Sequence, residues 1–69
     1  MNKEIAVKDR YNMILGWIHD YPDRKQAIHI KKGYVGYYSK SADLTIDSKG
    51  AIYCYGDGLS DLIRNADRS

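Results

Sequence analysis

The chain lacks phenylalanine entirely and contains a single cysteine and a single proline. Because Cys54 is the only cysteine, no disulfide can form within the chain. Cys54 and two distant histidines, His19 and His29, also do not make a structural zinc site. No apolar run approaches the ~20 residues that span a bilayer, and no apolar signal-peptide core follows Met1. We therefore expect no bound metal, no membrane segment and a cytoplasmic protein.

Recognisable catalytic and cofactor motifs are also missing. Gly56-Asp57-Gly58 precedes a predicted helix, but it lacks the third glycine and the basic residue of a phosphate-binding loop. A general base needs a positioned partner, and the sequence shows none for His29. We predict a protein without enzymatic activity and without a cofactor.

The 69 residues suffice for one domain, residues 1–69. With 43% apolar and 29% charged residues, the composition is that of a folded globular chain. A domain of this size buries only ~60% of the surface of its unfolded chain, so its core is small. A homodimer, which would bury further apolar surface, is left open.

Tyrosine takes the place of phenylalanine. The chain has seven tyrosines, and five of them lie between positions 34 and 55. A tyrosine ring offers apolar area but carries a hydroxyl that needs water or a hydrogen-bond partner. Such rings are therefore expected to be half exposed, and half-exposed rings bind proteins and nucleobases.

The first segment, about Lys3 to His19, predicts a helix. Asn2 is the expected N-cap. Pro22 ends the helix, because it has no amide hydrogen and disfavours helical geometry at the residue before it. Apolar residues recur at helical spacing on one face: Val7, Tyr11, Ile14, Leu15 and Ile18.

Three or four short strands are expected next, in segments 27–31, 34–39, 44–46 and 51–55. Lys32-Gly33 is either a hairpin turn or a bulge within one long bent strand. Asp47 and Gly50 predict a type I turn between the last two strands. A C-terminal helix capped by Asp57 follows, with apolar residues at Leu59, Leu62, Ile63 and Ala66.

The predicted fold is α+β, in the order α-β-β-β(-β)-α. It is a small antiparallel meander of three to four strands, with an N-terminal and a C-terminal helix packed on one face. Strand alternation would direct these residues toward the helices: Ile28, Ile30, Val35, Tyr37, Leu44, Ile46, Ile52 and Cys54. The opposite, open face would carry His29, Lys31, Tyr34, Gly36, Tyr38, Thr45, Ala51, Tyr53 and Tyr55.

The net charge of +2 is unevenly distributed, because residues 21–40 carry five basic side chains and one acidic one. Several of these lysines flank the tyrosines, which predicts a shared aromatic and basic surface. The predicted partner-binding residues are His29, Lys31, Lys32, Tyr34, Tyr38, Lys40, Tyr53 and Tyr55. Two plainer interpretations stay open: tyrosine pairs that only stabilise the sheet, and lysines that only protect strand edges.

These features favour a non-enzymatic binding module with a protein partner. A phage or mobile-element inhibitor of a host defence nuclease complex, of the anti-CRISPR type, is an example of such a small chain without motifs. The alternative is binding of RNA or single-stranded DNA through the same surface. The order helix, three strands, helix resembles the double-stranded RNA-binding domain, but Asp57 and Asp61 stand where such domains need lysines. No family is assigned.

Overall fold

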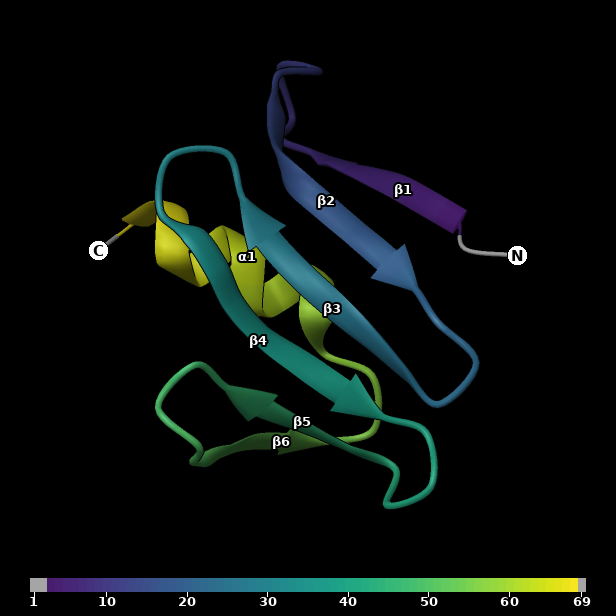
Figure 1. The fold of residues 1–69 in the computed structure, drawn as a ribbon. Coiled ribbons are helices and arrows are strands. Elements are labelled where there is room, and N and C mark those ends of the chain that lie inside the picture. The colour runs from purple at the N-terminus through teal and green to yellow at the C-terminus, as the bar shows by residue number, and fades with distance from the viewer. Residues whose placement is uncertain (1–2, 69) are drawn as a thin grey trace.

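A computed structural model describes residues 3–68 of the chain. Within this range six strands are followed by one helix (Figure 1). Each strand pairs antiparallel with the next one along the chain, so the spatial order equals the sequence order. The elements are β1 (Lys3–Lys8), β2 (Ile14–Asp20), β3 (Arg24–His29), β4 (Gly33–Ser39), β5 (Leu44–Asp47), β6 (Ile52–Tyr55) and α1 (Leu59–Arg68).

The predicted order α-β-β-β(-β)-α is wrong, because the sheet has six strands rather than three or four. The predicted N-terminal helix is absent, because residues 3–20 form the hairpin of β1 and β2. A tight turn divides the apolar pattern into two strands. The Asp9 Oδ1 atom accepts hydrogen bonds from the amides of Tyr11 at 2.8 Å and Met13 at 3.0 Å. Asn12 adopts a left-handed φ of 66°, which asparagine tolerates better than most residues. The predicted cap, Asn2, lies outside the described residues.

The structure of the C-terminal half agrees better with the prediction made from the sequence. The predicted helix is present as α1, and Asp57 Oδ1 accepts a hydrogen bond from the Leu59 amide at 3.2 Å. Asp47 Oδ1 likewise holds the turn between β5 and β6, accepting from the amides of Lys49 and Ala51. Of the two alternatives for Lys32-Gly33, the hairpin is correct and the long bent strand is not. Its turn is formed by residues 30–32, however, and Gly33 begins β4, where it pairs with His29.

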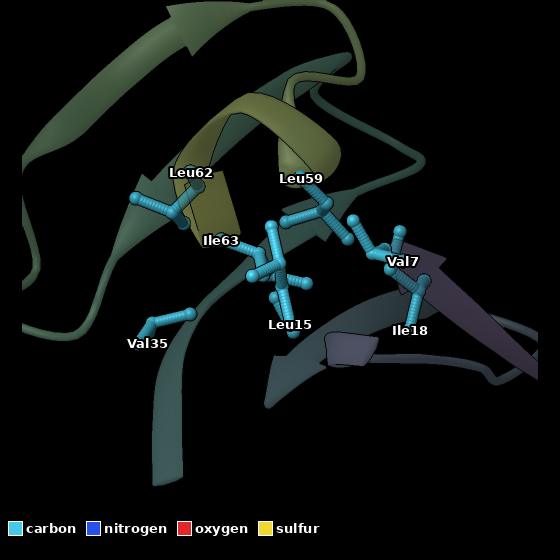
Figure 2. Close-up of a cluster of buried hydrophobic side chains, with 8 residues drawn as sticks. Val7, Leu15, Ile18, Val35, Leu59, Leu62 and Ile63 are labelled. Carbon is cyan, nitrogen blue, oxygen red and sulfur yellow. The ribbon is translucent and has the colours of Figure 1, made fainter. Parts of the chain in front are cut away.

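The helix α1 lies across one face of the sheet and contacts β2, β3 and β4 (Figure 1). Its apolar residues meet side chains of the sheet in a single cluster (Figure 2). The core therefore lies between two layers, the sheet and the helix α1, on one side of the sheet. Its members are Val7, Leu15, Ile18, Ala27, Val35, Leu59, Leu62 and Ile63.

Three β-bulges decide which side chains reach this core. In each, one strand contributes an extra residue that has no partner in the register: Leu15 in β2, Val35 in β4 and Tyr53 in β6. Leu15 and Val35 are buried in the core, and Tyr53 packs against it. Since a bulge places two successive residues on the same side, the strict alternation assumed from the sequence fails at these points.

Candidate protein-binding surface

The second face of the sheet is covered by no helix or strand of residues 3–68. Directly paired residues of an antiparallel sheet share a face, so the register identifies its members. One row runs through Trp17, Ile28 and Tyr34, and the neighbouring rows follow in the same way. We define the uncovered face by its apolar and aromatic residues: Ile14, Trp17, Ile28, Tyr34, Tyr37, Leu44, Ile46, Ile52 and Tyr55.

The uncovered face is unusually apolar for a solvent-exposed surface. Tyr34, Ile52 and Tyr55 are 45%, 56% and 82% exposed. Trp17 and Tyr37 are half-buried among their neighbours on the same face. Partial burial raises the pKa of the Tyr34 hydroxyl above its ordinary value near 10, and the neighbouring Tyr37 adds to the shift. A contiguous apolar patch of this kind marks an interaction site more often than a bare surface.

Two polar contacts involve charged side chains on this side of the sheet. His19 pairs with Gln26, which in turn pairs with Tyr37, so these three residues form one row of the uncovered face. The His19 Nε2 atom lies 3.5 Å from a carboxylate oxygen of Glu4. The Arg24 guanidinium lies 5.7 Å from the centre of the Tyr37 ring. Arg24 also pairs with the Asp23 carboxylate at 3.1 Å, which raises the pKa of the guanidinium further. The charge of Arg24 is therefore balanced by Asp23, whereas Lys8 stands on the same face opposite Ile14.

The four tyrosines predicted to share the open face are divided between both sides of the sheet. Tyr34 and Tyr55 lie on the uncovered face, whereas Tyr38 and Tyr53 lie on the helix side. The Tyr38 hydroxyl donates to Asp43 Oδ1 at 2.6 Å, and this bond raises the pKa of the hydroxyl. The Tyr53 hydroxyl accepts a hydrogen bond from Asn65 of α1. The bulges at Val35 and Tyr53 cause this separation.

His29 was expected on the open face but lies beneath α1, with 2% of its surface exposed. Its Nδ1 atom accepts hydrogen bonds from the amides of Lys31 and Lys32 at 3.1 and 3.2 Å. Its Nε2 atom lies 3.1 Å from Asp67 Oδ1 of α1. Because Nδ1 accepts two bonds, the proton of the neutral ring is on Nε2 and is donated to Asp67. His29 therefore joins the β3–β4 turn to the helix.

The predicted lysines do not form one patch. Lys31 and Lys32 lie in the turn between β3 and β4, whereas Lys40 follows β4 at its other end. The Lys40 ammonium donates to Asp20 Oδ1 and to the Tyr21 carbonyl oxygen, both at 2.7 Å. The aromatic and basic surface expected from the sequence is thus replaced by an apolar face with lysines at two opposite ends.

The assignment of the two faces was reversed for most of the aliphatic residues. Ile28, Leu44, Ile46 and Ile52, with Tyr37, were expected beneath the helices and lie on the uncovered face. The covered face instead holds small or polar residues beside the core. These are Gly16, Ala27, His29, Gly36, Tyr38, Thr45 and Cys54. Gly16 in β2 and Gly36 in β4, on either side of β3, were the sequence signal for a helix that approaches closely.

The described residues contain no group of His, Cys, Asp or Glu side chains able to hold a metal ion. Among them, no helix has the length and apolar character needed to cross a membrane. No family model, curated protein or solved structure matches the chain.

Proposed function

We propose that the protein is a non-enzymatic binding module. Its uncovered face binds a flat, apolar surface of another protein. One observation carries the proposal: the only tryptophan and three of the five tyrosines of the sheet, Tyr34, Tyr37 and Tyr55, lie on the side that α1 leaves open. The pairing of Arg24 with Asp23 favours an apolar partner surface over a charged one.

The size of the face supports a specific interface. The molecule measures 33 × 28 × 18 Å, and its thin dimension corresponds to the two layers of sheet and helix. A face bounded by the two longer dimensions is comparable to the ~800 Å² that each partner contributes to a standard interface. Aromatic anchors such as Trp17, Tyr34 and Tyr37 are the residue types that dominate binding energy in such interfaces.

The separation of the lysines favours a protein over a nucleic acid. Bases stack well on exposed rings, but tight binding also needs cations along the path of the backbone. Lys40 is engaged by Asp20, and Lys25 is engaged by Asp57 at 3.2 Å. A cytoplasmic site of action is part of the proposal and is supported by the single cysteine. That the partner is a host defence nuclease stays a prediction.

The test compares two double variants of equal chemistry. Tyr34→Ser with Ile52→Ser removes apolar area from the uncovered face, and Tyr11→Ser with Met13→Ser removes it from the exposed β1–β2 turn. Proteins captured from the native host are identified by mass spectrometry, and the affinity of each purified candidate is measured for both variants. We expect the first variant to lose at least about tenfold in affinity and the second to bind like the parent chain.

Three outcomes would contradict the proposal. Equal affinities of the two variants would place the interface elsewhere. A concentration-dependent dimer in light scattering, abolished by Tyr34→Ser with Ile52→Ser, would show that a second copy covers the face. A shift of labelled RNA or single-stranded DNA at low salt, lost in the same variant, would assign the face to nucleic acid.

A further inference from the structure

A second site lies at the end of the molecule where the β1–β2 turn meets the C-terminal turn of α1. A pocket of about 460 Å³ opens there, within the ~300–1,000 Å³ range of small-molecule sites. Leu15, only 7% exposed, is its apolar component. The other lining residues are charged: Asp9, Arg10, Arg64, Asp67 and Arg68.

Both carboxylates of the pocket are engaged by the protein itself. Asp9 Oδ1 accepts the amide hydrogens of Tyr11 and Met13 and so closes the β1–β2 turn. Asp67 Oδ1 accepts the Nε2 proton of His29, whose other ring nitrogen is held by two backbone amides. These bonds fix both carboxylates in structural roles at the edges of the pocket.

The three arginines of the pocket, unlike its carboxylates, have only weak contacts with the other residues that the structure describes. Arg64 Nη2 reaches the Lys8 carbonyl oxygen only at 3.5 Å, and the Arg10 guanidinium lies 5.1 Å from the centre of the Tyr11 ring. Within residues 3–68, none of the three pairs with a carboxylate at 4.0 Å or less, unlike Arg24, Lys25 and Lys40 elsewhere. Arg64 and Arg68 are four residues apart in α1 and therefore lie on the same side of the helix.

We propose that this pocket binds the phosphate group of a small organic phosphate. A guanidinium is always charged and presents its donors as a fork that matches phosphate oxygens. Arg10 from the turn and Arg64 and Arg68 from the helix supply such forks from two elements. A phosphate dianion has the oxygens and the charge to engage more than one fork. Leu15 offers apolar area to the organic part of the ligand.

The proposal is tested by NMR on the full chain, observing the arginine Nε–Hε signals at low salt. The probes are inorganic phosphate, pyrophosphate, a nucleoside monophosphate and the matching nucleoside. We expect saturable shifts of the Arg64 and Arg68 signals with the three phosphates, at a Kd on the order of 1 mM, and none with the nucleoside. Added salt should weaken binding by screening. A tighter monophosphate identifies an organic phosphate as the ligand, whereas equal affinities identify free phosphate.

Matched variants separate this site from general charge effects. Arg64→Gln with Arg68→Gln and Lys3→Gln with Lys49→Gln each remove two positive charges. The arginine variant should weaken pyrophosphate binding by about tenfold or more, and the lysine variant by less than about twofold. If the arginine pair does not fold, Arg68→Gln alone serves, with a loss of about threefold expected. Equal weakening in both variants, linear shifts without saturation, or shifts that lie away from the pocket would overturn the proposal.

Discussion

The two faces of the sheet differ in the size of their side chains more than in their polarity. The face beneath α1 carries Gly16, Ala27 and Gly36, whereas the uncovered face carries Trp17 and Tyr34 among its larger residues. At Gly36, an added Cβ would come within 2.6 Å of Leu62 Cδ2 and would also meet the Ile46 carbonyl oxygen. A helix packs where small residues let it approach closely, so the most apolar face need not be the covered one.

The covered face also shows how polar residues are accommodated in a small core. Thr45 is fully buried, donates to the Gly56 carbonyl oxygen at 2.7 Å and accepts from the Gly58 amide at 2.9 Å. No buried side-chain nitrogen or oxygen of the described residues lacks a hydrogen-bond partner. Polarity alone therefore did not exclude these residues from the helix side, because each polar group is satisfied there.

The largest expected effect comes from replacing one isoleucine on each side of the sheet. Ile63→Ala, at a fully buried position of α1, should lower the free energy of unfolding by about 2–5 kcal/mol through lost burial and a residual cavity. Ile52→Ala, at a position 56% exposed on the uncovered face, should cost less than about 1 kcal/mol. Urea unfolding of the two variants measures the difference. Equal costs would mean that Ile52 is covered in solution.

A smaller effect is expected for two tyrosines of β6 that lie on opposite faces of the sheet. Tyr53→Phe removes the hydroxyl that accepts a hydrogen bond from Asn65 and should cost about 0.5–1.5 kcal/mol. Tyr55→Phe changes a ring that is 82% exposed on the uncovered face and should leave stability within about 0.5 kcal/mol of the parent chain. Thermal and urea unfolding provide the measurement. The reverse order would contradict the assignment of the bulge at Tyr53.

The smallest effect concerns the rim of the sheet at low pH. The Lys40 ammonium, through its hydrogen bond to Asp20, lowers the pKa of that carboxyl below its usual 3.8. A carboxyl with a lowered folded-state pKa contributes stability above its unfolded pKa, and this contribution is lost as the pH falls through the folded value. Lys40→Gln should therefore flatten the acid limb of the stability profile below pH ~4. Lys49→Gln is the matched control and should leave that limb unchanged.

Local signals in the C-terminal half predicted the β5–β6 turn and the helix α1 correctly. Asp57 caps α1 and Asp47 holds its turn, because each side chain bonds amides only two to four residues away. The prediction of a helix in the N-terminal segment failed because the apolar residues of this segment fit both a helical period and two alternating strands. The Asp9 turn, which distinguishes them, depends on side-chain bonds that the hydrophobic pattern does not show.

The candidate surface was predicted in part. Tyr34 and Tyr55 lie on the uncovered face, as expected, but Tyr38, Tyr53 and His29 lie on the helix side. Their binding role stays a prediction, and for His29 it now competes with a structural role beneath α1. A single extra residue at a bulge reverses the face of every residue beyond it, so alternation carried across Val35 or Tyr53 gives the wrong side.

The sequence alone determined that the strands are rich in tyrosine and isoleucine and that an amphipathic helix follows them. Those properties follow from composition, short turns and helical period, which act over a few residues. Only the tertiary structure decided which face the helix covers. That choice depends on three bulges and on the close approach of Leu62 to Gly36, which join residues far apart in the chain.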